Sequence, residues 1–169
     1  LSIRTPGQRS VDAAHVAEMA RRAVVERFGT EAYSSGIRVT TSLRAADQRA
    51  ATEAVQRGVM ALEARSPWRG PEDQLDLPET DGTALDNAIA EGLKGQRDDD
   101  LLRLGVVLSA SPKAVQLQLA SGERVTIQGN GLRLAAAGLS SKAKPALRLQ
   151  RGSVVRVVAS GKALAITQW

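Results

Sequence analysis

The sequence contains no cysteine and a single histidine, His15. Without cysteine the chain can form no disulfide bond and no thiolate metal site. A single histidine cannot form a histidine-rich metal centre, and it makes Ser/His/Asp or Cys/His catalysis improbable. Aromatic residues make up only 2% of the chain, which argues against a surface that stacks sugars or bases. We therefore expect neither a metal nor a cofactor.

The chain also lacks the run of about 18 apolar residues that a membrane-spanning helix requires. Hydrophobic residues account for 43% of its 169 residues and charged residues for 24%, which is the composition of a folded globular protein. The first residue is Leu1 rather than methionine, and we expect the sequence to be a piece of a longer chain.

Negative charge is scarce in the second half. Residues 101–169 hold 10 basic residues and one acid, Glu123, whereas residues 1–100 hold 13 basic and 17 acidic residues. This asymmetry suggests two units with different surroundings. Solvated side chains on strand faces explain the excess as well as a surface for an anionic partner does. Such a surface would gather these arginines on one side: Arg124, Arg133, Arg148, Arg151 and Arg156.

Periodicity divides the first 100 residues into two parts. In residues 1–71, apolar residues at helical spacing predict two helices, and the β-branched stretch Gly36–Leu43 between them predicts a strand. Residues 72–100 form an acidic connector, in which Ala84–Lys94 is expected to be a short helix with Leu85 and Ile89 facing inward.

Beyond Asp100 the hydrophobic period changes to two, which is typical of strands. Five strands are predicted: Leu102–Leu108, Ala114–Leu119, Arg124–Gln128, Ser153–Ala159 and Ala163–Gln168. Gly122 is expected to adopt a positive φ in the turn between the second and third. The long excursion before the fourth strand matches the order of a five-stranded OB-type barrel over residues 101–169, and the fold class is then α+β. A small SH3-like barrel or an open meander is the alternative.

Two motifs invite a chemical interpretation that their surroundings do not support. Ser141 and Lys144 match the S-x-x-K nucleophile pair of penicillin-recognising enzymes, but the partner motifs of that site are missing and Pro145 follows. Asp98–Asp100 could attract a hard cation, yet three consecutive side chains do not converge easily on one ion. We therefore expect no catalytic residue and no metal ligand in this sequence.

Several motifs of the first half occur in a characteristic order. The helix around Val16–Gly29 precedes Gly36–Leu43, a second helix with Ala50–Ala51, and the turn Trp68–Pro71 of sequence WRGP. Together they resemble the interdomain segment of class A penicillin-binding proteins. Arg44–Ala45 stand where that family usually has Asp-Pro.

The second half is similar to the OB-type domain that the 1A subgroup of this family inserts after the turn. The matching stretches are Gly105–Leu108, Ser121–Gly122, Gly131–Ala135, Gly152–Val157 and Ile166–Trp169. Leu134 replaces the tryptophan that is usual in the family.

The resemblance implies a noncatalytic linker and OB-type module of a bifunctional peptidoglycan synthase, which spaces its two active sites. The glycosyltransferase domain would precede Leu1 and the transpeptidase domain would follow Trp169. The implied location is the periplasmic face of the bacterial inner membrane, reached through the parent's own anchor. The implied partners are these flanking domains and, on the module's surface, peptidoglycan or a lipoprotein activator.

An independent basic OB-fold that binds an anionic ligand, such as single-stranded nucleic acid, is the alternative. It would use the five arginines named above. Nucleic-acid binding of this kind needs aromatic platforms for base stacking, and residues 101–168 contain none.

Overall fold

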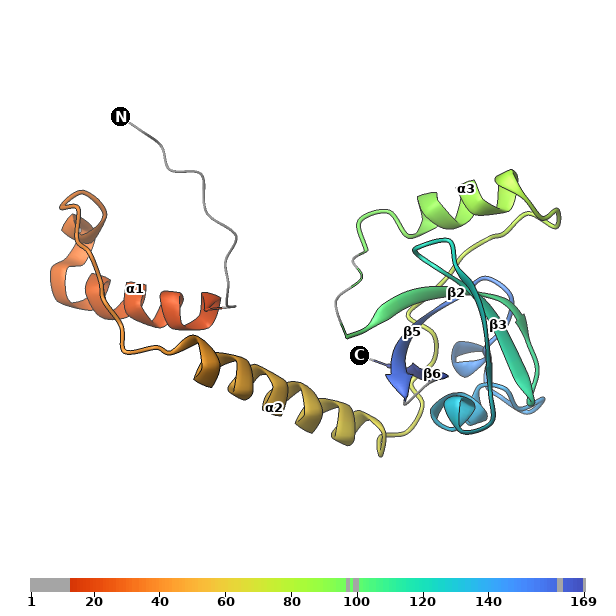
Figure 1. Cartoon of the computed structure of the whole chain (residues 1–169). Helices are drawn as coiled ribbons and strands as arrows, with labels where there is room; N and C mark the ends of the chain where they lie inside the picture. The colour runs from red at the N-terminus through yellow and green to blue at the C-terminus, as the bar shows by residue number, and fades with distance from the viewer. Residues whose placement is uncertain (1–12, 97, 99–100, 161–162, 169) are drawn as a thin grey trace. The chain divides into compact units, whose positions relative to one another are not determined.

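The computed structural model describes residues 13–96, 98, 101–160 and 163–168, and the chain divides into two compact units. Unit 1 is Leu1–Met60 and unit 2 is Ala61–Trp169. This division falls earlier than the one expected after residue 71, because the turn that begins at Trp68 belongs to unit 2. Figure 1 shows the helices and strands of each unit.

Unit 1 is helical. It contains α1 (Ala14–Phe28), the short 3-10 helix η1 (Gly29–Tyr33) and most of α2 (Ala45–Glu63). Helix α1 ends at the predicted glycine, Gly29, whose φ of 59° a residue with a side chain rarely adopts. Neither α1 nor α2 has a buried residue. Large apolar side chains are exposed instead, as Val55 is at 65%.

The strand predicted over Gly36–Leu43 does not form. Residues 36–44 have no regular secondary structure, and their alternating apolar residues Ile37, Val39 and Leu43 are exposed. A strand needs a neighbour to pair its backbone N–H and C=O groups. Among the described residues of unit 1 no second strand offers that pairing.

A charge cluster on α1 gives unit 1 a measurable pH signature. Hydrogen bonds from Arg21 and Arg22 to the Glu18 carboxylate lower the pKa of Glu18 to about 2. Because the folded-state pKa lies below the ordinary value of 4.5, the stabilisation is present above about pH 4.5 and is lost as the pH falls through about 2. We expect an NMR titration of Glu18 to show this midpoint, and the variant Arg21→Ala to raise it. A midpoint near 4.5 in the unchanged chain would contradict the prediction.

Unit 2 is built on one antiparallel sheet with the strand order β1-β5-β2-β3-β4, in which β6 also pairs with β5. Its strands are β1 (Asp73–Gln74), β2 (Arg103–Ala110), β3 (Ala114–Leu119), β4 (Arg124–Gln128), β5 (Ser153–Ser160) and β6 (Ala163–Thr167). The α+β class is confirmed. The sheet has six strands rather than the predicted five, because Asp73–Gln74 adds a short strand beside β5. It is also not closed, since no β4–β6 ladder joins its ends among the described residues.

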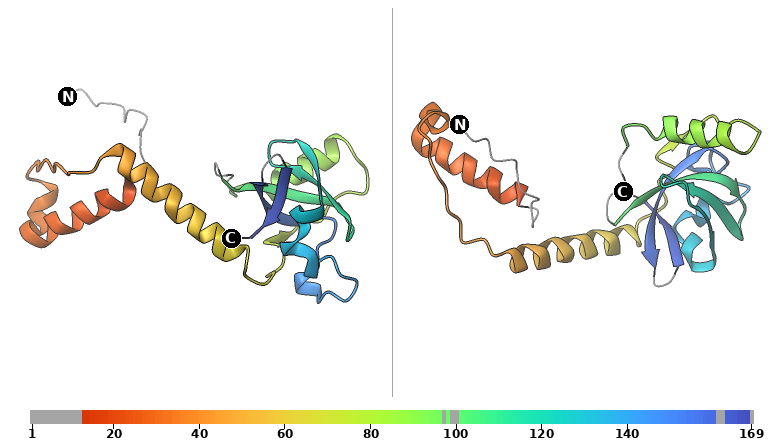
Figure 2. Two further views of the ribbon diagram at one scale, coloured as in Figure 1. Left: turned by 60° about the horizontal axis from the view of Figure 1, so that its bottom comes forward. Right: turned by 45° about the horizontal axis from the view of Figure 1, so that its top comes forward.

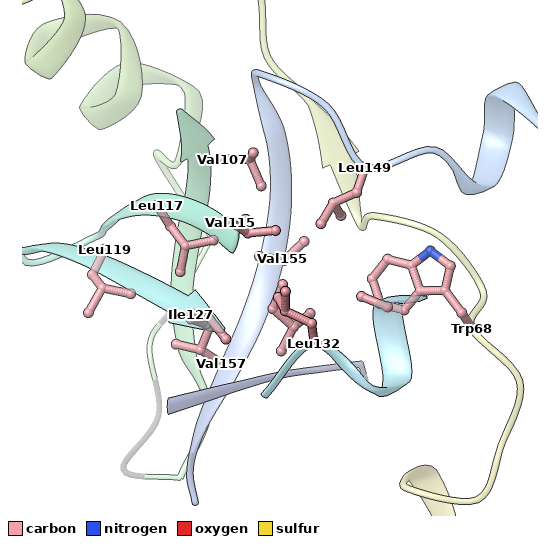
Figure 3. Packing of buried hydrophobic residues seen from close by; sticks show 12 residues of the cluster. Trp68, Val107, Val115, Leu117, Leu119, Ile127, Leu132, Leu149, Val155 and Val157 are labelled. Carbon is pink, nitrogen blue, oxygen red and sulfur yellow. The ribbon is translucent and has the colours of Figure 1, made fainter. Parts of the chain in front are cut away.

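The sheet separates two hydrophobic clusters. On one face, α3 (Thr83–Gly92) packs Leu85 and Ile89 against Leu104, Val106 and Val154. On the other face, the inward residues of the sheet are covered by Trp68 and by the excursion that contains η2 (Gly129–Leu132) and η3 (Leu134–Ala137), as Figure 3 shows. This alternation of side chains between two covered faces explains the period of two in the sequence.

The predicted turns and strands of unit 2 agree closely with the structure. Strands β3 and β4 have the predicted bounds, and Gly122 in the turn between them has a φ of 85°. Strand β2 runs two residues further than expected, through an irregularity in register between Val107 and Ser109. Helix α3 ends at Gly92 rather than at Lys94, and Gly82, not a capping side chain, precedes it.

Candidate functional site

The five arginines singled out in the sequence do not form one surface. In the strand register, Arg124 lies opposite Gln118 and Arg156 lies opposite Leu104, which places both on the sheet face that carries α3. Arg133 and Arg148 belong to the excursion over the other face. The expected gathering on one side is therefore wrong, because alternate strand positions and an irregular loop direct these side chains to opposite faces.

Four of the arginines make contacts within unit 2, and Arg148 is one of them, since it donates to the Ala143 carbonyl oxygen at 3.1 Å. Arg156, with a side chain only 15% exposed, pairs with Glu72 at 3.1 Å. Arg151 donates to the carbonyl oxygens of Leu108 at 3.2 Å and Pro78 at 2.8 Å, and so ties the connector to β2. Arg124 donates its Nε–H to the side-chain oxygen of Gln118 at 3.1 Å. The contacts of Arg124, Arg151 and Arg156 tie segments of the fold together, whereas Arg133 and Arg148 are exposed on the excursion.

The α3 face carries a groove of about 500 Å³. Ile89 of α3 and Leu93, the residue after the helix, line it together with the turn between β3 and β4. Beneath its polar edge, the buried Gln118 amide donates to Asp86 at 2.8 Å while its oxygen accepts from Arg124. Two hydrogen bonds thus connect Arg124, Gln118 and Asp86, and they hold the Asp86 carboxylate at the groove. Sequence reasoning missed Gln118, although a glutamine between Leu117 and Leu119 in a strand is the signal of a polar contact on the opposite face.

We expect Gln118→Ala to destabilise unit 2 by about 1–3 kcal/mol, the usual cost of leaving buried hydrogen-bonding groups without partners. Gln118 is only 4% exposed and joins two charged side chains, so its removal leaves both Asp86 and Arg124 without this contact. Urea unfolding followed by circular dichroism measures the loss. The matched variant Gln116→Ala, at an exposed position of the same strand, should change stability by less than about 0.5 kcal/mol. Equal losses of stability in the two variants would contradict the role given to the hydrogen bonds of Gln118.

The excursion on the opposite face contains a closed loop. The backbone N–H of Leu149 donates to the Gly138 carbonyl at 2.9 Å, which brings together the ends of residues 138–149. We call this segment the basic loop, because it carries Lys142, Lys144 and Arg148 and no acidic residue. Ser141 and Lys144 of the S-x-x-K match both lie in it and both are exposed, so the structure gives this pair no enclosed site.

Trp68 holds the basic loop on unit 2. Its side chain is 6% exposed, and its Nε1–H donates to the Leu147 carbonyl at 2.8 Å. Figure 3 shows its indole together with Leu132, Leu149 and Val155 in the hydrophobic cluster. The turn that the sequence assigned to the linker is therefore part of the core of unit 2.

The remaining candidates give no site. Among the described residues no group of three His, Cys, Asp or Glu side chains is placed to hold a metal ion. Asp98 accepts a hydrogen bond from the Leu104 backbone, while Asp99 and Asp100 lie outside the described residues. No helix in the described ranges is both long and apolar enough to cross a membrane.

The fold and the sequence place the chain in a class. Unit 2 is an OB-like domain, and the family model for the "Penicillin-binding protein OB-like domain" matches residues 68–169. The match begins at Trp68, the residue at which the core of unit 2 begins. The chain belongs to the penicillin-binding proteins that carry this domain.

Relatives over nearly the whole chain agree with this assignment. Penicillin-binding protein 1A of Neisseria flavescens is 36% identical over 92% of this chain, and that of Pseudomonas aeruginosa is 29% identical over 92%. The chain spans 19% and 18% of the length of these two relatives. The crystal structure of penicillin-binding protein 1A from Haemophilus influenzae matches 98% of this chain and 24% of its own with a TM-score of 0.67, and at 24% identity that likeness supports the fold.

Proposed function

We propose that the chain is the noncatalytic linker and OB-type module of a bifunctional peptidoglycan synthase, which spaces a glycosyltransferase and a transpeptidase site. The match of residues 68–169 to the OB-like domain, within relatives named penicillin-binding protein 1A, is the observation that carries this proposal. The parent would act at the periplasmic face of the inner membrane.

The exposed apolar surface of unit 1 supports a linker role. Its helices bury no residue, and Ile37, Val39 and Leu43 present an alternating apolar pattern without a partner strand in this unit. Such surfaces are normally covered by protein. In a parent roughly five times longer, flanking domains supply that cover.

Unit 2 supports a rigid spacer. Hydrogen bonds join residues near its two ends: the Gln168 side chain accepts from the Arg69 backbone N–H at 2.9 Å and donates to the Pro67 carbonyl at 2.9 Å. Contacts between residues so distant in sequence hold the entry and exit of the domain together. A nucleic-acid binder has less support, because Trp68 is buried and the arginines occupy opposite faces.

The test uses a longer protein that contains this chain. Residues 61–169 are replaced with a flexible Gly/Ser linker, and glycan polymerisation, penicillin labelling and cross-linking of new glycan are measured separately. We expect the first two to persist and cross-linking to fall. Unchanged cross-linking, or labelling of the purified 169-residue chain by fluorescent penicillin, would overturn the proposal.

A further inference from the structure

The basic loop is held in place more firmly than its sequence alone would suggest. Besides the Trp68 hydrogen bond to Leu147, a Cβ built on Gly138 would lie 2.4 Å from the Leu147 oxygen and 2.5 Å from the Trp68 ring nitrogen. A Cβ on Gly70 would lie 2.4 Å from the Ala146 oxygen. The Trp68 indole and Gly70 therefore fit tightly against the base of the loop, at Gly138, Ala146 and Leu147.

The far part of the loop is braced by its own hydrogen bonds. The Ala143 N–H donates to the Ser140 carbonyl at 3.0 Å, and Arg148 donates to the Ala143 carbonyl at 3.1 Å. Lys142 and Lys144 are exposed on either side of Ala143. Figure 2 shows this light-blue segment standing out from the sheet of unit 2. Compact loops whose ends meet are frequent binding sites, because the scaffold fixes their side chains.

The connector and α3 of unit 2 are acidic, although Arg124 and Arg156 share their face of the sheet. The segment 72–91, which leads into and forms α3, holds seven acidic residues and no basic residue. The basic loop lies over the other face, where Leu139 and Leu147 pack against the cluster that contains Trp68. Layers on a sheet are about 10 Å apart, so the acidic layer and the basic loop are roughly 20 Å apart, and an anion bound at the loop lies much nearer to the loop's cations than to the acids. The acids therefore do not cancel the attraction of the loop for an anion.

We propose that the basic loop binds the carboxylates of peptidoglycan stem peptides through Lys142, Lys144 and Arg148. This inference rests on the proposed function, which supplies the polymer, and it names the surface and the chemistry. Ala143, Pro145 and Ala146 between the cations are small, Leu147 packs against the core, and the loop contains no aromatic side chain of the kind that anchors protein interfaces or stacks bases. A polymer with carboxylates on its repeats suits lysine side chains, since their flexible point charges can each reach a carboxylate without a fixed geometry.

The experiment is co-sedimentation of the 169-residue chain with purified sacculi at about 150 mM salt, where long-range attraction is largely screened. We expect the double variant Lys142→Glu/Lys144→Glu to weaken binding about tenfold. The double variant Lys113→Glu/Arg38→Glu changes two exposed cations elsewhere by the same net charge and should weaken binding less than twofold. Lys142→Gln/Lys144→Gln gives a milder variant, and thermal melts confirm that each protein is folded.

The ligand is tested in parallel. The unchanged chain should bind about tenfold more weakly to sacculi whose carboxylates have been converted to amides, a loss similar to that of the Lys142→Glu/Lys144→Glu variant. Equal losses for the two charge-reversal variants, no effect of amidation, or equally tight binding to phosphatidylglycerol vesicles or to an oligonucleotide would overturn the inference. So would a chain that binds no sacculi at all. That last outcome leaves the spacer proposal intact, because cross-linking in the longer protein is measured independently.

Discussion

Replacing Trp68 with alanine is expected to destabilise unit 2 by about 3–5 kcal/mol, the usual cost of removing a buried aromatic side chain. The indole is 6% exposed, belongs to the cluster under the basic loop and donates to the Leu147 carbonyl. Its loss creates a cavity and leaves that carbonyl without the bond. Urea unfolding followed by circular dichroism measures the change in the free energy of unfolding.

The variant Trp68→Phe separates the two contributions. Phenylalanine keeps much of the apolar contact and loses the Nε1–H, so it should cost less than alanine by about 1–2 kcal/mol or more. A loss below about 1 kcal/mol for Trp68→Ala would mean that the turn is peripheral to the core, as the sequence-based boundary after residue 71 implied.

The sequence predicted the strands of unit 2 better than their partners. Val115, Leu117 and Ile127 alternate with polar residues because one side of each strand enters a core, so β3 and β4 could be placed from the pattern. Strand β1 could not, since two residues contain no period. It exists because Asp73 pairs with Val154, far along the chain.

The segment at residues 36–43 shows the opposite limit. Its alternation of Ile37, Val39 and Leu43 reports side chains that share a side, but a strand also needs a backbone partner, and local sequence does not say where that partner is. The same reasoning applies to Trp68, because its partner Leu147 lies 79 residues further along the chain.

The arginines show which part of a site the sequence can reveal. Arg156 stands between the buried Val155 and Val157, so alternation already places it on the other face of β5. Arg124 precedes Val125 in the same way. Arg148 is close in sequence to Lys142 and Lys144, but it lies in irregular backbone, where no period fixes the direction of its side chain. A net charge of one sign over a segment therefore does not define a surface.

Gly152→Ala is the second substitution with a large expected effect. Gly152 has a φ of 86°, and a Cβ there would lie 2.1 Å from the Leu75 carbonyl oxygen. The Leu75 N–H also donates to the Gly152 carbonyl at 2.8 Å, so the connector, which pairs with β5 through β1, lies against the residue before β5 without room for a side chain. Backbone strain and overpacking, each about 1–3 kcal/mol, should add to a loss of roughly 2–6 kcal/mol in the free energy of unfolding.

Gly122→Ala is the matched control, because Gly122 has a φ of 85° and a Cβ there would meet nothing within 4 Å. It should cost only the strain, about 1–2 kcal/mol. The difference between the two variants in urea unfolding then measures the close approach of Leu75 to β5. If the two losses are equal, the connector moves aside at little cost, and segment 72–77 does not contribute to the rigidity that a spacer between two active sites requires.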